Sequence, residues 1–159
     1  MKTLAQELTR EHQDIDGAIA AFTAQAADGQ PQAPTLRAAL ATLRRHIWLE
    51  ETMLFPPMRQ GSAFAAIFAM LREHGQMWPI LDRLDEQLER GAAAREVAAT
   101  LAELAQVLAA HNDKEERTIY SLADAAHEGE SAQKMMALMA DGEMPAGWRC
   151  ARAEPAAGS

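Results

Sequence analysis

The sequence has very little cysteine: Cys150 is the only one among 159 residues. A single cysteine cannot form an intrachain disulfide, and cysteine-based zinc motifs need several thiolates at close spacing. Its position near the end of the chain gives no indication of a buried nucleophile either. The sequence therefore predicts neither a disulfide framework nor a thiolate metal site.

Residues that favour β-strands are also scarce, whereas alanine, leucine, glutamate, glutamine and arginine, which favour helices, are common. The sequence contains no βαβ unit, no glycine-rich phosphate loop and no G-x-S-x-G elbow. Aromatic residues make up 5% of the chain and are spread along it, so they do not form an array on which nucleic-acid bases could stack. We therefore expect an all-α protein without the common nucleotide-binding or hydrolase motifs.

Positive charge is in deficit, with 15 lysines and arginines against 23 aspartates and glutamates and a net charge of -8. Such a chain has no overall field that attracts nucleic acid or an anionic membrane. No apolar run is long enough to span a membrane, and the first residues are charged, without the apolar stretch of a signal peptide. We expect a cytoplasmic protein with neither a nucleic-acid nor a membrane partner, and the sequence leaves its oligomeric state open.

Apolar residues recur every three or four positions along four long stretches, as they do on one face of a helix. Thr3 and Gln6 can form a capping box at the start of the first stretch, which ends within residues 28–34. Thr35 and Ser62 are the expected caps of the second and third helices.

The same spacing of apolar residues, together with the prolines, predicts where the helices continue and end. Residues 56–57 are both proline and should end the second helix. The apolar stripe of the third helix starts at Phe64 and continues beyond Pro79, so this proline is expected to kink the helix without ending it. The stripe of the fourth helix runs to Leu122.

Four long helices with short connections predict an up-and-down four-helix bundle, which we place at residues 1–127. Residues 128–159 should add a short C-terminal helix and an irregular tail. The short helix is expected to dock on the bundle through three methionines, namely Met135, Met136 and Met139.

One phrase occurs twice in the chain. Residues 46–55 are HIWLEETMLF and residues 111–120 are HNDKEERTIY, which share the pattern H-x-x-x-E-E-x-x-[apolar]-[aromatic]. The helix before each phrase carries a histidine preceded by glutamate, in the segments EHQDID and EHGQMW. Each half of the chain is therefore a helical hairpin, and the two halves should be related by a pseudo-twofold axis through the core.

The repeated pattern points to a metal site. Histidine and glutamate four residues apart lie on the same helix face, and here that face is the apolar one. Burying an ionised carboxylate without a partner is costly, and a pair of cations in the core offsets this cost because each carboxylate can bridge both ions. Imidazole together with carboxylate suits iron, manganese or zinc better than calcium. The candidate ligands are His12, His46, Glu50, His74, His111 and Glu115.

Each of these residues taken alone has a simpler interpretation. A single histidine on an apolar stripe is usually a core residue with one hydrogen bond, but a metal-free bundle would leave two buried glutamates without compensation. His127 lies beyond the repeat in a loop and is expected to be solvated. Glu51 and Glu116 follow the ligand glutamates and are expected to point away from the core, as outer charges or as hydrogen-bonding partners of the ligands.

Ferritin-like di-iron proteins use E-x-x-H on two helices and glutamate on the other two, which differs from the order and spacing here. The order H…HxxxE…H…HxxxE, with its E-E-x-x-[LI]-[FY] continuation, instead resembles the hemerythrin-like family, the HHE cation-binding domains, over about residues 1–125. The resemblance implies an up-and-down bundle with a non-haem di-iron centre bridged by two carboxylates and an oxo or hydroxo group. It implies that the six candidates ligate iron, with Glu50 and Glu115 as bridges, although other divalent metals could occupy such a site.

The sequence departs from the oxygen-carrying members of that family at Trp78, where their pattern H-x-x-x-H has a second histidine. Asp16 occupies the matching place on the first helix and could add an oxygen ligand or orient His12. Asp16, Trp78 and Tyr120 are thus candidates for outer partners of the ligands or for the wall of the site. An iron with fewer protein ligands keeps more open positions.

We therefore expect a di-iron protein that binds or reacts with a small diatomic molecule or oxidant, such as oxygen, nitric oxide or peroxide. Members of the family with altered sites are also linked to iron delivery and redox sensing. The alternative is therefore an iron storage, delivery or redox-sensing module that acts through a protein partner. The sequence does not decide whether the centre turns over a substrate, and it identifies no catalytic residue.

Overall fold

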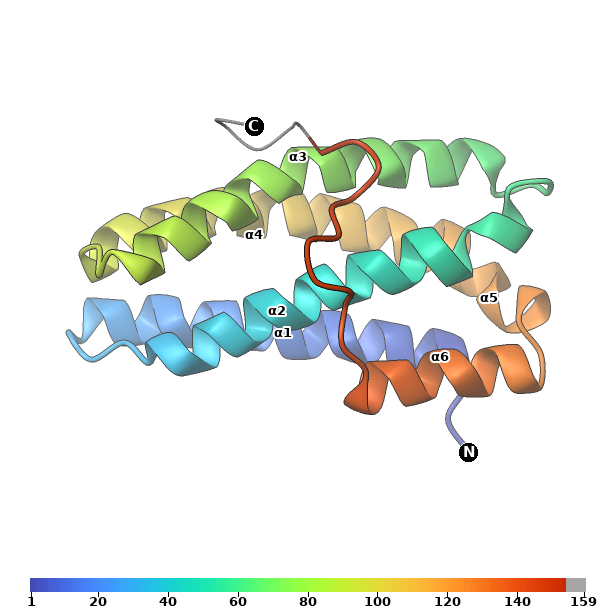
Figure 1. Cartoon of the computed structure of the whole chain (residues 1–159), viewed down its shortest axis with the longest axis horizontal. Coiled ribbons are helices and arrows are strands. Elements are labelled where there is room, and N and C mark those ends of the chain that lie inside the picture. Colours follow the sequence, from blue (N-terminus) through green and yellow to red (C-terminus); the bar gives the residue numbers. More distant parts are fainter. Residues whose placement is uncertain (154–159) are drawn as a thin grey trace.

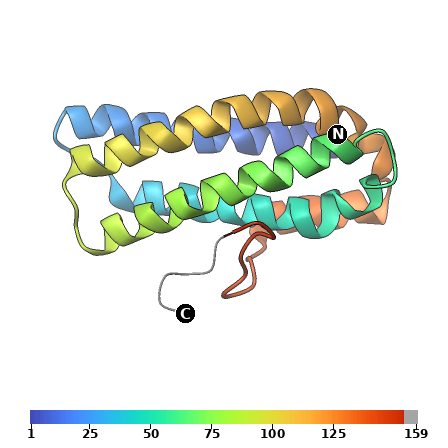
Figure 2. The ribbon, with the colours of Figure 1, turned by 90° about the horizontal axis from the view of Figure 1, so that it is seen from above.

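The computed structural model describes residues 1–153, and every regular element among them is helical. Four long helices form the body of the molecule (Figure 1): α1 (Leu4–Ala27), α2 (Ala33–Leu49), α3 (Phe64–Glu89) and α4 (Ala94–Glu115). Helices α1 and α2 form one antiparallel hairpin and α3 and α4 form another (Figure 2). The hairpins pack through α1 against α4 and α2 against α3. The predicted all-α, up-and-down four-helix bundle is confirmed.

The second helix of each hairpin continues directly into a π turn. The turn η1 (Glu50–Leu54) follows α2, and η3 (Glu116–Tyr120) follows α4. A 3-10 turn, η2 (Pro56–Met58), begins at the two prolines predicted to end the second helix. After η3 come the short helices α5 (Ser121–Ala126) and α6 (Glu130–Asp141).

The first helix begins as the sequence predicts, with Thr3 and Gln6 exchanging side-chain to backbone hydrogen bonds in a capping box. The other two predicted caps are wrong. Helix α2 begins before Thr35, because Pro34 has a backbone conformation suited to the first turn of a helix. The N-cap position of α3 is the residue after Ser62, and no side-chain hydrogen bond caps that helix.

The π turns change which residues face the core. A π turn closes its hydrogen bond one residue later than an α turn, so the inward face moves on by one position. Within η3 the buried residues are Ile119 and Tyr120, whereas Leu122, predicted to continue the stripe, is 38% exposed. The prediction for Phe64 is also wrong, because this residue lies in the first turn of α3 and is 62% exposed.

The apolar core consists of two clusters, one toward each end of the bundle. On α1, Leu8 belongs to one cluster and Ile15 to the other, with His12 between them. On α3 the same division falls at His74, and the helix then continues through Pro79 without interruption. The two clusters therefore leave a polar layer between them, across the middle of the bundle.

The prediction that His127 is solvated is wrong, because this residue is only 5% exposed. Its Nε2 atom lies 3.0 Å from the carbonyl oxygen of Leu54, and its Nδ1 atom lies 2.9 Å from the hydroxyl of Ser131. A proton on Nε2 donates to the carbonyl at the end of η1, while the hydroxyl donates to Nδ1. His127 therefore ties the start of α6 to the end of η1, which is a structural role.

The end of the chain returns to the bundle. Helix α6 contacts α1 and α2 through Met135 and Met139, which are buried, with Met136 partly buried. Residues 142–153 then cross α2 toward α3 as an irregular segment (Figure 1) and bury Cys150. The division of the chain into two parts stays a prediction. Within residues 1–153, no helix combines the length and the apolar character needed to cross a membrane.

Candidate metal centre

A layer of buried histidines and glutamates separates the two apolar clusters. All six candidate ligands lie in this layer, each at most 3% exposed: His12, His46, Glu50, His74, His111 and Glu115. Each long helix contributes one histidine, and each glutamate lies at a junction between an α-helix and a π turn. The repeated phrase thus brings equivalent groups from both hairpins to one level of the bundle.

These side chains form two overlapping sets, in each of which the ligand atoms lie within 4.8 Å of one another. The first set consists of His12, His46, Glu50 and Glu115, and the second of Glu50, His74, His111 and Glu115. Because Glu50 and Glu115 belong to both sets, their carboxylates lie where groups shared by two ions would have to lie.

The two shared carboxylates contact histidines of both hairpins. The contacts, all between a carboxylate oxygen and an Nε2 atom, are Glu50–His46 at 2.9 Å, Glu50–His74 at 3.3 Å, Glu115–His12 at 3.4 Å and Glu115–His111 at 3.3 Å. Each carboxylate therefore joins the two halves of the pseudo-symmetric layer.

Each histidine also faces another glutamate with its second ring nitrogen, Nδ1. The pairs are His12–Glu116 at 3.0 Å, His46–Glu11 at 3.2 Å, His74–Glu51 at 3.2 Å and His111–Glu73 at 3.3 Å. Every pair joins neighbouring helices, so the four pairs close a ring from α1 through α2, α3 and α4 back to α1. An Nδ1 proton donated to a carboxylate fixes the tautomer and leaves the Nε2 lone pair directed into the core.

The structure corrects the sequence interpretation of these outer glutamates. Glu51 does not point away from the core, because it is only 8% exposed, and Glu116 is partly exposed. Of the two predicted roles, hydrogen bonding to the ligands is the one their contacts fit. Sequence reasoning misses Glu11 and Glu73, although the glutamate-histidine pair repeated in both halves is the signal that marks them.

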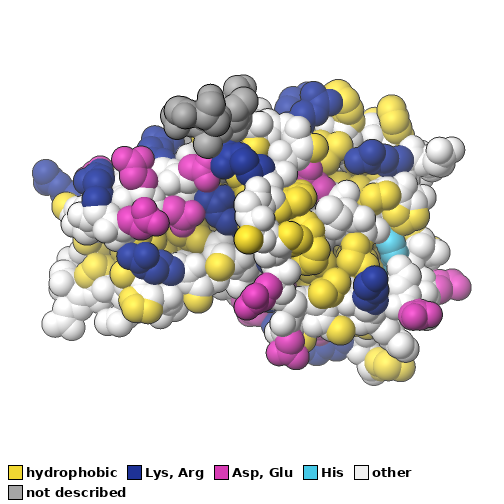
Figure 3. Space-filling model, in the orientation of Figure 1, with side chains coloured by type: hydrophobic (Ala, Val, Ile, Leu, Met, Phe, Trp, Pro, Cys, Tyr) yellow, Lys and Arg dark blue, Asp and Glu magenta, His cyan; other side chains and the backbone are white. Residues whose placement is uncertain are grey.

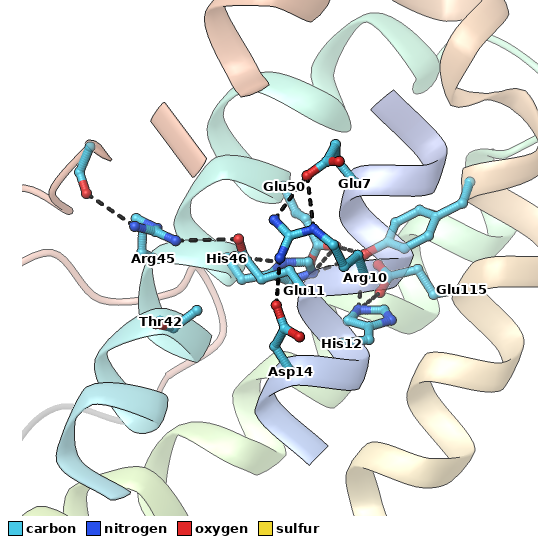
Figure 4. A network of polar contacts seen from close by, with 12 residues as sticks. Glu7, Arg10, Glu11, His12, Asp14, Thr42, Arg45, His46, Glu50 and Glu115 are labelled. Atoms are coloured by element: carbon cyan, nitrogen blue, oxygen red, sulfur yellow. Dashed lines mark hydrogen bonds and ion pairs between the residues drawn. The ribbon is translucent and has the colours of Figure 1, made fainter. Parts of the chain in front are cut away.

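Cations hold two of the outer carboxylates in place. Arg45 lies 3.2 Å from Glu11, and Lys114 lies 2.6 Å from Glu73. Hydrogen bonding to His111 and Lys114 lowers the pKa of Glu73 to about 2, so this carboxylate is ionised at neutral pH. Figure 4 shows the chain of contacts that leads from Arg45 through Glu11 to the histidine of α2.

Tyr120 brings a hydroxyl group into the first set. Its oxygen lies 2.9 Å from Nε2 of His46 and 3.0 Å from Nε2 of His12. It donates to Oε1 of Glu50 at 2.5 Å. The matching residue in the other hairpin is Phe55, whose ring stacks on the α3 histidine at 5.9 Å between centroids. At this pair of positions the two halves therefore agree in aromatic packing, and Tyr120 differs from Phe55 by one oxygen atom.

The remaining two candidates lie outside the six-residue layer. Asp16 is exposed; partial burial of its carboxyl raises its pKa, and His12 opposes that shift. Trp78 is buried, with its ring edge-on to Trp148 at 5.5 Å and under the guanidinium of Arg44 at 4.7 Å. These contacts place the Trp78 side chain of α3 between α2 and the tail, and its role as a wall of the site stays a prediction.

The charges of the layer are compatible with a cation site. Burial raises the pKa of Glu50 and Glu115, but the neighbouring histidines outweigh this effect, so both pKa values are lowered. Burial lowers the pKa of His111, but Glu115 and its neighbours outweigh it and raise that pKa to about 10. The protein therefore places two ionised carboxylates in its core and needs positive charge beside them, from protons on the histidines or from metal.

The donor atoms fit metal ions better than protons. Among residues 1–153, both oxygens of Glu115, Oε2 of Glu50 and Nε2 of His74 are buried and form no hydrogen bond, although three of these four atoms make the longer ion-pair contacts given above. Buried polar atoms of this kind are rare, because each one costs free energy. A cation that accepts lone pairs from all of them satisfies the whole group, and the mixture of imidazole and carboxylate suits iron, manganese or zinc.

The chain matches the family described as Hemerythrin HHE cation binding domain over residues 3–123. No curated protein and no solved structure matches it. The matched span contains the four long helices and all six residues of the buried layer, and it leaves α6 and residues 142–153 outside.

Proposed function

The chain belongs to the hemerythrin HHE cation-binding family, and we propose that its buried layer holds two iron ions. One ion lies in the first set and the other in the second, with Glu50 and Glu115 shared between them. The observation that carries this proposal is the pair of carboxylates, each fully buried and each in contact with histidines from both hairpins. A single ion cannot use the donor atoms of both sets.

The outer glutamates support the same proposal. Glu116, Glu11 and Glu51 each lie within hydrogen-bonding distance of the Nδ1 atom of a histidine of the layer, and Glu73 lies 3.3 Å from the fourth as an ion pair. A carboxylate in this position orients imidazole toward a metal and raises its basicity. A core histidine with a purely structural role needs only one hydrogen bond, whereas each of these histidines faces a carboxylate with both ring nitrogens. Four such histidines, each oriented from the neighbouring helix, favour coordination over packing.

Iron is the metal we propose, because the first set offers a phenol as well as carboxylate and imidazole. Burial and the nearby Glu115 and Glu50 raise the pKa of Tyr120 well above its usual value, so the metal-free protein keeps it protonated. Tyr120 is placed to give an additional oxygen to the first ion, and such oxygen donors suit iron in its higher oxidation state better than zinc.

The function we propose is binding of, or reaction with, a small molecule such as oxygen, nitric oxide or peroxide. Iron supplies the change of oxidation state and the open coordination positions that such chemistry needs. The second set has Phe55 where the first has Tyr120, so it has one protein donor fewer. Bulky substrates are disfavoured, because the ligand residues are almost completely buried.

The first set also has a route toward solvent. A pocket of about 340 Å³ opens between α1 and η3, and Arg10, Glu116 and Tyr120 are among the residues that line it. Glu116 is the most exposed of the four outer glutamates, with 36% of its side chain accessible. It therefore joins the pocket to the Nδ1 atom of His12 and can exchange a proton between solvent and the layer.

The alternative is an iron-delivery or redox-sensing module that acts through a protein partner. Within this alternative, a storage role is disfavoured, because two ions per chain store little iron. Turnover separates an enzyme from a carrier or sensor. The loaded protein should be mixed with peroxide and a reductant, and steady peroxide loss would identify an enzyme, whereas a single stoichiometric reaction would identify a carrier or sensor.

The proposal is tested by loading the protein with iron(II) without oxygen and then admitting oxygen or nitric oxide. We expect a new visible or near-ultraviolet spectrum with each gas. Glu50→Ala should lose at least one ion and most of the spectral change. Glu103→Ala is the matched control, because Glu103 is an exposed glutamate of α4 paired only with Arg83 among the described ion pairs. Equal behaviour of the two variants would contradict the proposal.

A further inference from the structure

The irregular segment after α6 forms hydrogen bonds near both of its ends with residues that surround the histidines of the buried layer. This segment, the C-terminal strap (residues 142–153), lies outside the span that matches the family. It crosses α2 and reaches α3 (Figure 1), on a face where hydrophobic and charged side chains gather together (Figure 3). Its contacts lead toward both sets of the buried layer.

The start of the strap is linked to the first set. The carbonyl oxygen of Gly142 accepts a hydrogen bond from Nη1 of Arg45 at 3.3 Å. The other terminal nitrogen of the same guanidinium donates to Glu11 at 3.2 Å. Glu11 in turn faces Nδ1 of His46. One arginine therefore joins the backbone of the strap to the carboxylate that orients a ligand of the first ion.

The end of the strap is linked to the second set by a shorter path. The backbone N–H of Ala151 donates to Oε1 of Glu51 at 2.9 Å, and Oε2 of Glu51 lies 3.2 Å from Nδ1 of His74. The two oxygens of one buried carboxylate are thus divided between the strap and a ligand. When the strap leaves, Glu51 loses one of the contacts that fix it against His74.

The middle of the strap packs closely on the bundle. Trp148 lies against Trp78, and the thiol residue Cys150 is 4% exposed within the apolar core. The backbone of Arg152 approaches α3 at Gly75, where an added Cβ atom would lie 2.7 Å from the carbonyl oxygen of Arg152. Only glycine allows this approach, and Gly75 directly follows the ligand His74.

We propose that docking of the C-terminal strap and metal occupancy of the buried layer are coupled through Glu51 and Arg45. The coupling rests on the proposed metal function and adds its regulation. A docked strap holds the outer carboxylates that orient His46 and His74, so it strengthens metal binding. By thermodynamic linkage, bound metal holds the strap down by the same factor. The state of the centre is thereby carried to a surface segment that a protein partner can reach.

The chain contains its own reporter for this coupling. Cys150 is the only cysteine, and a thiol reagent can reach it only when the strap lifts. The rate of labelling by a thiol reagent is measured in the metal-free protein and in protein loaded anaerobically with iron(II). We expect iron(II) to slow labelling about tenfold, within the usual range of coupling between sites.

Two glycines provide a matched pair of variants. Gly75→Ala places a methyl group against the strap, whereas Gly17→Ala makes the same change inside α1, where an added Cβ meets nothing within 4 Å. Both substitutions favour the helix itself. Gly75→Ala should speed labelling of Cys150 in the metal-free protein and weaken iron(II) binding by about the factor by which iron(II) slows labelling in the wild type. Gly17→Ala should change neither.

Glu51→Ala separates the coupling from general stabilisation by metal. In this variant iron(II) should still bind, with lower affinity, but labelling of Cys150 should respond to it far less than in the wild type. If wild-type labelling is indifferent to iron(II) although iron(II) binds, the coupling is overturned and the metal function stands. The coupling is equally overturned if Gly75→Ala and Gly17→Ala have the same affinity and labelling rate. If no metal binds at all, the metal function fails, and the coupling fails with it.

Discussion

Removing the hydroxyl oxygen of Tyr120 should lower the stability of the metal-free protein and the iron affinity of the loaded protein. It donates to Glu50 at 2.5 Å and lies within 3.0 Å of the Nε2 atoms of His12 and His46. Tyr120→Phe removes this oxygen and leaves the ring. Phe55 already occupies the equivalent place in the other hairpin, so the substitution should create neither a cavity nor a clash.

The expected cost follows from the hydrogen bond to a buried carboxylate. Hydrogen bonds to charged groups contribute about 1.5–3 kcal/mol to stability. We therefore expect metal-free Tyr120→Phe to unfold at a free energy about 2 kcal/mol lower than the wild type. For a chain of this size, that is a decrease of about 4–8 °C in Tm. In the loaded protein, loss of a donor beside the first ion should weaken one of the two iron sites about 10–100-fold.

Calorimetry of the metal-free protein and competition with an iron chelator measure these two effects. Thr100→Val is the control, because it removes another buried hydroxyl, which accepts a hydrogen bond from Gln87 at 2.9 Å and lies outside both sets. The control should lose stability without changing iron affinity. If Tyr120→Phe left both Tm and iron affinity unchanged, the contacts that we assign to the hydroxyl would be refuted.

Three further predictions concern the same layer. Because the pKa of His111 is raised to about 10, protonated His111 stabilises the metal-free protein below pH 6.5, and this contribution is lost as pH rises toward about 10. The Tm of the metal-free protein should therefore fall over that range, while the gain in Tm from added metal should grow. A parallel pH dependence of Tm in both forms would count against competition between protons and metal. Phe55→Tyr should give the second set the oxygen it lacks and slow the reaction of the reduced protein with oxygen in stopped-flow mixing, whereas an unchanged rate would mean that the second set is not where oxygen reacts. Trp78→His should place an imidazole one turn after His74 and slow the same reaction, whereas Trp78→Ala should speed it; if both leave the rate unchanged, Trp78 has only a packing role.

The four helices and the six layer residues could be predicted because they depend on local periodicity. Residues that recur every three or four positions share a helix face, and a repeated His-x-x-x-Glu motif on that face places like groups at one level. The capping box at Thr3 is local in the same sense. Its two hydrogen bonds join residues three positions apart, so the sequence alone carries the information.

What the sequence does not reveal depends on changes of phase and on contacts between distant segments. Tyr120 is predicted from the sequence only as a candidate outer partner of the ligands or wall residue. The π turns move it inward and move Leu122 outward, a shift that the α-helical period does not predict. Glu51 turns out to be buried because it meets His74 from another helix. His127 and the C-terminal strap lie in irregular segments, where burial follows from tertiary contacts and leaves no periodic pattern.

The presence of two metal ions in one buried layer is tested most directly by metal analysis during titration. Iron(II) is added without oxygen to metal-free protein, the unbound metal is removed, and iron and protein are measured on the same sample. We predict saturation at two ions per chain for the wild type and at no more than one for Glu115→Ala. Saturation of the wild type at one ion per chain, or an unchanged value of two in Glu115→Ala, would contradict a dinuclear centre that shares this carboxylate.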